Sequence, residues 1–169
     1  MKRNLIFATI TLLGGIYASA ASAELLIGAK LGAAQIDTTG AGVDYDYGVQ
    51  GSVQLGYEII NLGLADIAIE GELTTAITDA EDSGGVFGDL SFESTGLYAS
   101  IRSAGPVYVI GRVGYVNGEI TGPGGSVDDS SVSKGIGVGF SGGLRFEIEY
   151  TTYEVENIDV EYISLGLSF

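Results

Sequence analysis

Apolar and polar residues alternate along most of this chain, and this two-residue period constrains its fold more than any other feature. The clearest run, VQGSVQLGYEI at residues 49–59, places Val53, Leu55 and Tyr57 on one side and Gln54 and Glu58 on the other. Such alternation is typical of a β-strand with one apolar and one polar face. The pattern predicts eight strands, four of them clear (49–59, 67–77, 144–151 and 162–169) and four weaker (25–34, 95–102, 107–116 and 134–141).

The composition agrees with a β fold and excludes several classes of function. The 169 residues include 28 glycines, and each glycine inside a helix costs about 1 kcal/mol relative to alanine. Hydrophobic residues make up 46% of the chain, which excludes a disordered protein. The absence of cysteine and histidine excludes disulfides, thiolate metal sites and histidine-dependent catalysis. The formal net charge of -15 argues against nucleic acid as a partner, because such a chain repels phosphates.

The first 23 residues have the three parts of a secretory signal peptide. Lys2 and Arg3 form a basic head, residues 5–16 are apolar, and Ala21-Ser22-Ala23 is a small-residue cleavage site. The apolar run is shorter than the ~20 residues that a membrane-spanning helix needs, so a membrane anchor is disfavoured. We therefore expect residues 1–23 to be a cleaved signal peptide and residues 24–169 to form one domain.

The links between the predicted strands alternate in length. Short turns with glycine or proline, which suit β-hairpins, are expected at residues 61–63, 103–106 and 142–143. Longer polar loops are expected at residues 38–46, 79–89, 121–132 and 154–159. Short turns at one end, long loops at the other and an even strand number are the plan of a transmembrane β-barrel.

Alternation alone does not say which face points outward, and a soluble eight-stranded barrel or sandwich would place the apolar face inside. The charges of the polar face favour the membrane barrel, because they are nearly balanced in a strongly acidic chain. Buried charges must be paired, and an eight-stranded barrel is just wide enough to be filled by side chains. We expect an ion-pair network in the lumen that consists of Lys30, Glu58, Glu70, Glu72, Arg112, Arg145, Glu147 and Glu149. Replacing Arg145 by alanine is then expected to destabilise the barrel by several kcal/mol, of the order found for broken buried pairs.

On these features the chain resembles the small outer-membrane β-barrel family, which includes the outer membrane protein A transmembrane domain, outer membrane protein X and the opacity proteins. LRFEIEY at residues 144–150 and SLGLSF at 164–169 are similar to that family's closing hairpin. The resemblance implies an all-β, eight-stranded antiparallel up-and-down transmembrane β-barrel in the outer membrane of a Gram-negative bacterium. The sequence ends at Phe169; we expect no appended domain, and the resemblance is not taken to imply the peptidoglycan-tethering role of outer membrane protein A.

The resemblance also implies partners. A barrel of this family contacts outer-membrane lipid and lipopolysaccharide, and its last strand is a signal read by the barrel-assembly machinery. In this chain the signal residues would be Tyr162, Leu165, Leu167 and Phe169. Outward aromatic rings near strand ends form interfacial girdles in such barrels, and we expect Tyr57, Tyr115, Tyr150 and Phe169 to lie there.

Two patterns on the polar face could carry chemistry. GVGFSG at residues 137–142 fits GxGxxG, but a dinucleotide site needs a following helix, and the next residues alternate as a strand. We favour glycines that ease a crowded barrel wall. A glutamate pair could serve as the acid and base of a glycosidase, but an ion-pair network is the favoured interpretation.

Acidic residues gather in three of the expected loops. Their oxygen ligands suit divalent cations such as Ca²⁺ or Mg²⁺, but no EF-hand pattern is present, so solvated loop charge is favoured and divalent cations remain an alternative partner. The residues are Asp79, Glu81, Asp82 and Asp89 in one loop, Asp128 and Asp129 in another, and Glu154, Glu156 and Asp159 in the third.

The sequence favours a non-enzymatic protein with no cofactor, no metal and no catalytic residue. We expect it to contribute to envelope integrity or to surface interaction and adhesion through its acidic loops. Two alternatives are a narrow porin-like passive channel and a soluble periplasmic lipocalin-like binding protein.

Overall fold

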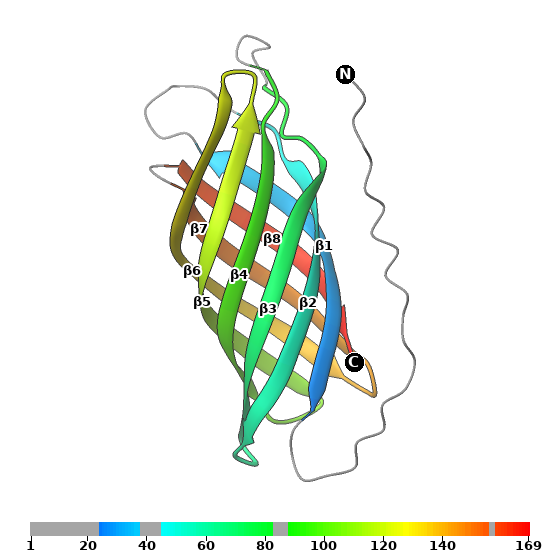
Figure 1. Ribbon diagram of the computed structural model, residues 1–169. Helices are drawn as coiled ribbons and strands as arrows, with labels where there is room; N and C mark the ends of the chain where they lie inside the picture. Colours follow the sequence, from blue (N-terminus) through cyan, green and yellow to red (C-terminus); the bar gives the residue numbers. More distant parts are fainter. Residues whose placement is uncertain (1–23, 38–44, 83–87, 156–157) are drawn as a thin grey trace.

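Eight antiparallel strands close into a barrel in the computed structural model (Figure 1), which describes residues 24–37, 45–82, 88–155 and 158–169. Each strand pairs with its neighbours in the sequence, and β8 pairs with β1 to close the barrel. The predicted all-β, up-and-down, eight-stranded barrel is therefore confirmed. The strands are β1 (Leu25–Asp37), β2 (Gly48–Asn61), β3 (Ala65–Thr78), β4 (Ser91–Ser103), β5 (Val107–Gly122), β6 (Gly125–Ser141), β7 (Arg145–Val155) and β8 (Ile158–Ser168).

The three short turns lie together at the lower end of the barrel in Figure 1, as the sequence predicts. They occupy residues 62–64, 104–106 and 142–144. Gly63 and Gly143 have φ values of 74° and 98°, a conformation that glycine adopts without steric cost. These turns fix one end of the barrel, which we call the short-turn end, and the opposite end is the loop end.

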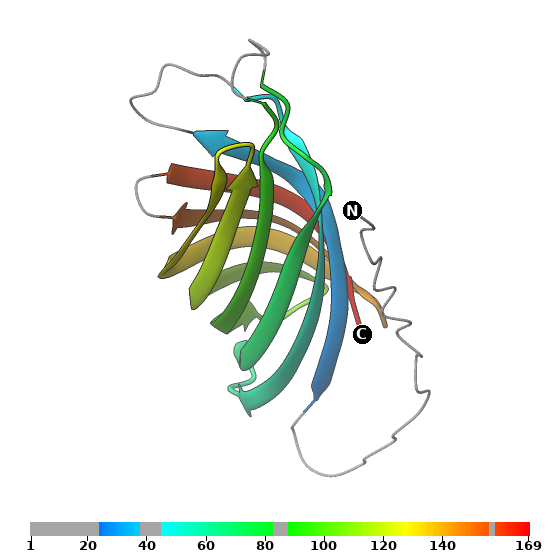
Figure 2. The same cartoon turned by 45° about the horizontal axis from the view of Figure 1, so that its top comes forward.

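Two of the four expected long loops are largely strand instead. β5 and β6 pair as far as Gly122 and Gly125, so the expected loop at 121–132 is wrong and this hairpin continues the barrel at the loop end (Figure 2). β7 and β8 pair as far as Val155 and Ile158, which shortens the expected loop at 154–159 in the same way. The serine and aspartate residues in these segments led to the prediction of loops. The side chain of Ile120 is buried inside the barrel, however, so the inward–outward alternation of β5 continues to the start of the expected loop. The other two expected loops lie partly outside the described residues, and Glu156 lies wholly outside them.

The apolar face of the barrel points outward and the charged face points inward. Leu55 is 59% exposed, whereas Arg112 on the opposite face is 5% exposed. Tyr57, Tyr115, Tyr150 and Phe169 are exposed, as expected for outward rings. This orientation is the one predicted for a membrane barrel, and it contradicts the soluble lipocalin-like alternative, which needs an apolar interior. Within the described ranges, no helix is long and apolar enough to cross a membrane.

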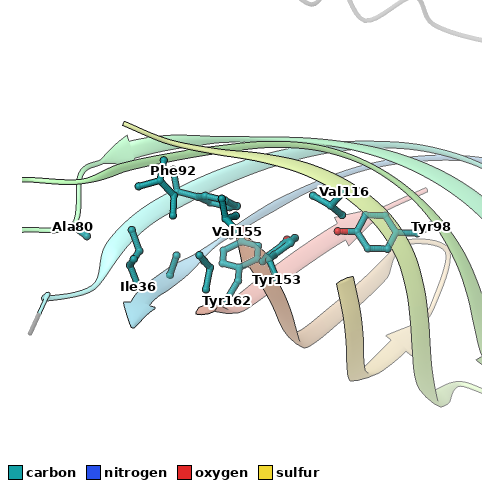
Figure 3. Packing of buried hydrophobic residues seen from close by; sticks show 11 residues of the cluster. Ile36, Ala80, Phe92, Tyr98, Val116, Tyr153, Val155 and Tyr162 are labelled. Carbon is teal, nitrogen blue, oxygen red and sulfur yellow. The ribbon is translucent and has the colours of Figure 1, made fainter. Parts of the chain in front are cut away.

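The interior is not polar throughout, because an apolar cluster fills it toward the loop end. Figure 3 shows this cluster, in which the Phe92 and Tyr153 rings lie 5.5 Å apart between centroids. The sequence analysis did not predict it. Its members are Ala34, Ile36, Ala80, Phe92, Tyr98, Val116, Ile120, Tyr153, Val155, Val160 and Tyr162. Tyr162, one of the predicted assembly-signal residues, therefore points inward, whereas Leu165, Leu167 and Phe169 point outward.

Candidate functional site

The charged side chains of the lumen come from inward positions on six strands, β1 to β5 and β7, and β6 contributes glycines where its neighbours have large side chains. A Cβ at Gly139 would lie 2.3 Å from the Tyr108 ring, and one at Gly135 would lie 2.8 Å from the Arg112 side chain. Gly139, within the GxGxxG pattern, and Gly135, just before it, thus make room for bulky side chains of the neighbouring strand. No helix follows the pattern, since β7 comes next, so the pattern is not a dinucleotide site.

A central group joins four of the predicted residues. Lys30 Nζ lies 2.8 Å from Glu149 Oε1 and 3.2 Å from Glu72 Oε2. Arg112 Nη2 donates to Glu72 Oε2 at 2.9 Å, and Arg112 Nη1 lies 3.5 Å from Glu149 Oε1. The Arg112 guanidinium also sits 3.5 Å above the centroid of the Tyr98 ring, a cation–π contact. All four charged side chains are buried, so this part of the lumen is an enclosed group of paired charges.

A second group lies nearer the short-turn end, and its cation is Arg102, which the sequence analysis missed. Arg102 Nε donates to Glu147 Oε1 at 2.8 Å, and Arg102 Nη1 pairs with Glu70. Ser100 Oγ donates to Glu70 Oε1 at 2.6 Å, and the Tyr108 hydroxyl donates to Glu147 Oε1 at 2.8 Å. A signal was present, because Arg102 shares the inward parity of Tyr98 and Ser100 in a predicted strand.

The remaining two predicted residues, Glu58 and Arg145, lie apart from these groups. Arg145 is the first residue of β7, at the rim of the short-turn end. Its Nη2 lies 3.2 Å from Glu24 Oε2 and 3.6 Å from Glu58 Oε2, and its side chain is 16% exposed. The structure therefore brings together Lys30, Glu70, Glu72, Arg112, Glu147 and Glu149 with Arg102, and leaves Arg145 and Glu58 as a separate pair at the mouth.

The lumen chemistry is that of paired charge, in which three buried cations contact four buried glutamates. Each of the four buried glutamates, Glu70, Glu72, Glu147 and Glu149, contacts at least one cation. A general acid or base must lie within hydrogen-bond reach of its substrate, whereas these carboxylates are enclosed. Each of them contacts a cation, although Glu70 Oε2 and Glu149 Oε2 have no hydrogen-bond partner. The arrangement is suited to holding the barrel together and to blocking passage through it.

The loop end carries unbalanced negative charge. Glu93, Glu119 and Asp128 are direct cross-strand neighbours on β4, β5 and β6, and all three are exposed. Burial raises the pKa of Tyr45 at this end, and the nearby Asp82 carboxylate raises it further. Among the residues that the structure describes, no three acidic side chains form a group that could hold a metal ion.

Comparison with known proteins agrees with this fold. The family model of the outer membrane protein beta-barrel domain matches residues 6–169, which confirms the resemblance stated from the sequence. No curated protein sequence matches the chain.

Several solved structures share the barrel. Ail, the attachment invasion locus protein of Yersinia pestis, in complex with the heparin analogue sucrose octasulfate, is 18% identical over 88% of this chain and 99% of its own, with a TM-score of 0.62. Neisserial surface protein A is 17% identical over 87% and 97%, with a TM-score of 0.57. The outer membrane enzyme PagL is 16% identical over 85% and 98%, with a TM-score of 0.51. At these identities the likeness establishes the fold.

Proposed function

The chain belongs to the outer membrane protein beta-barrel domain family, and from this premise we propose that it is a non-enzymatic surface protein with a closed lumen that acts through its acidic loop end. It resides in the outer membrane of a Gram-negative bacterium. The observation that carries the proposal is the contrast between the two charged regions. The charges inside the barrel are paired and buried, whereas those at the loop end are exposed and of one sign.

Two layers in series support a closed lumen. An ion that entered from the short-turn end would have to separate Arg102 from Glu70 and Glu147, and then Arg112 from Glu72. Beyond them lies the apolar cluster around Phe92 and Tyr153, where an ion would lose its hydration without a polar replacement. We therefore favour a closed barrel over the narrow passive channel.

The absence of enzymatic activity is proposed from the residues available. PagL is described as an outer membrane enzyme, so the fold alone does not decide whether a barrel of this kind has enzymatic activity. This chain contains no histidine, and the four buried glutamates are engaged by cations. In the described part of the lumen there is thus no imidazole to activate a serine, and each buried carboxylate that could activate a water molecule is held in an ion pair.

The sign of the loop-end charge indicates what kind of surface this protein contacts. Ail is described in complex with a heparin analogue, which is a polyanion. The row of Glu93, Glu119 and Asp128 would repel a polyanion, so heparin binding does not carry over. We propose instead a positively charged protein surface as the partner. Lipopolysaccharide bridged by divalent cations, and the barrel-assembly machinery acting on the last strand, are further proposed partners.

Adhesion and conductance measurements test this proposal together. Proteoliposomes that contain the full chain should bind polylysine-coated beads in a salt-sensitive manner and should not bind heparin-coated beads. Glu119→Gln should weaken bead binding, whereas Asp66→Asn near the short-turn end is the matched charge control and should not. Planar bilayers with the same protein should show no discrete conductance steps. Heparin binding would overturn the proposed partner, and regular conductance steps would overturn the closed lumen.

A further inference from the structure

A shallow groove of about 740 Å³ crosses the outward face of β1 to β4. Its lining is almost wholly apolar and includes Ile27, Leu55, Tyr57, Ile69, Leu73 and Leu97. The groove is part of the outward band that faces lipid in this family of barrels. It is therefore a hollow in a surface that the bilayer covers.

Gly71 creates the floor of this groove. It points outward on β3, and its direct cross-strand neighbours are Leu55 on β2 and Leu97 on β4. Ile69 and Leu73 flank it on the same face of β3 and are exposed. A Cβ at Gly71 would meet only the Leu55 carbonyl oxygen, at 3.8 Å. Four large aliphatic side chains thus surround a position that has no side chain.

The position of the groove within the bilayer indicates which lipid can reach it. Its lining runs from Ile59, close to the short β2–β3 turn, to Val53 on the same strand. Short turns face the periplasm in this class of barrel. Six residues of a strand tilted by ~45° rise about 14 Å along the membrane normal, close to half of the ~30 Å hydrocarbon core. The groove therefore spans the depth of the periplasmic leaflet.

We propose that this groove binds one acyl chain of a phospholipid from the periplasmic leaflet. A linear chain can enter the hollow over Gly71 and contact the flanking leucine and isoleucine side chains, which would otherwise lose dispersion contacts on that side. Tyr57 lies at the periplasmic end of the groove and is exposed. Its hydroxyl can donate a hydrogen bond to the ester or headgroup region, where amphipathic rings prefer to lie.

The occupant is a lipid rather than a second barrel because the groove continues the lipid-facing band on all sides. Its surroundings are exposed aliphatic residues such as Ile77 and Ile101. Association of two barrels within lipid gains nothing from hydrophobic burial and depends on packing and polar contacts, and the groove offers almost no polar surface. This proposal does not depend on the function proposed above, because it concerns the short-turn end of the barrel and not the loop end.

The test compares filling this groove with filling an equivalent outward position elsewhere. The full chain is extracted in mild detergent and reconstituted with spin-labelled phosphatidylethanolamine, and the motionally restricted fraction gives the relative association constant. Gly71→Leu should lower this constant by about tenfold, because the side chain takes the place of the acyl chain. The control is Gly111→Leu, since Gly111 is an outward glycine on β5 whose Cβ would meet only Ile101, at 3.7 Å. It should leave the constant unchanged.

Comparison of boiled and unboiled gel migration shows whether Gly71→Leu folds. If it does not fold, a second pair of variants keeps the test valid. Leu97→Ala removes one wall of the groove and should also weaken phospholipid association, whereas Ile136→Ala beside Gly111 should not. The proposal is overturned if the groove and control variants behave alike, or if the wild-type protein restricts no phospholipid. It is also overturned if native mass spectrometry finds a dimer whose formation, rather than lipid retention, is abolished by Leu97→Ala.

Discussion

Replacement of Arg102 by alanine is expected to destabilise the barrel strongly, because it leaves buried Glu147 without its cation and leaves buried Glu70 with only Arg112 Nη1, at 3.9 Å from Glu70 Oε2. The Glu70 and Glu147 side chains are each 3% exposed and both contact the Arg102 guanidinium. Breaking a buried ion pair by removing one partner costs about 3–5 kcal/mol. Glu70 keeps its bond from Ser100, and Glu147 keeps its bond from Tyr108. We therefore expect a loss near the lower limit, about 3 kcal/mol.

The assay is reversible unfolding in urea of the protein refolded into phospholipid vesicles, followed by far-ultraviolet circular dichroism. A double variant, Arg102→Ala with Glu147→Gln, removes one of the orphaned charges and should recover part of the loss. Direct partners typically show coupling energies of about 0.5–3 kcal/mol. Strict additivity of the two substitutions would mean that Arg102 and Glu147 do not interact in the folded barrel.

Arg145→Ala provides the matched comparison within the same assay. The sequence alone leads to an expected loss of several kcal/mol, but Arg145 lies at the mouth, and its nearer partner, Glu24, has a side chain that is 63% exposed. Exposed ion pairs contribute about 0–1 kcal/mol, and the buried side chain of Glu58 places the expected loss toward the upper end of that range. Equal losses for Arg102→Ala and Arg145→Ala would refute the reasoning from burial.

Two further predictions concern the packing of the barrel interior. Gly139→Leu should destabilise the barrel by about 1–3 kcal/mol through overpacking, because its Cβ would lie 2.3 Å from the Tyr108 ring. Val138→Leu on the outward face is the control. Equal free energies of unfolding in urea for the two variants would contradict the crowding argument. Phe92→Ala should cost about 3–5 kcal/mol, as for other buried phenylalanines, since it removes the ring that packs on Tyr153; a loss below 1 kcal/mol in the same assay would mean that the apolar cluster is not well packed.

The strands could be predicted because the period of two repeats around the whole barrel, and their orientation because the charges of the polar face are nearly balanced in a strongly acidic chain. Leu55 has apolar residues, and Glu72 has polar residues, at a spacing of two along the chain. A single irregular position therefore does not change the assignment of a face to the apolar or the polar side. The short turns were equally predictable, since Gly63 and Gly143 adopt backbone angles that favour glycine. These features depend on local sequence and need no knowledge of distant contacts.

The ion-pair partners could not be predicted in full because they depend on the stagger between strands. Arg102 and Glu147 lie 45 residues apart and meet across the lumen, which a strand assignment alone does not give. The alternation of Arg145 with Phe146 assigns Arg145 to the inward face as clearly as it does for other inward residues. Its place at the start of β7, however, leaves it at the rim. The β5–β6 extension was missed because Ser130 and Asp128 are poor strand formers, and their pairing is decided by the partner strand.

The lumen charges have a structural role that follows from the geometry of a membrane barrel. Lipid provides no driving force that distinguishes one strand register from the next as long as apolar residues face outward. A slip of two residues in β5 would keep its apolar residues outward but would move Arg112 about 7 Å along the lumen, away from Glu72 and Glu149. The two buried glutamates would then lose a cation, and breaking a buried ion pair costs about 3–5 kcal/mol. The paired charges therefore select the native register of the strands.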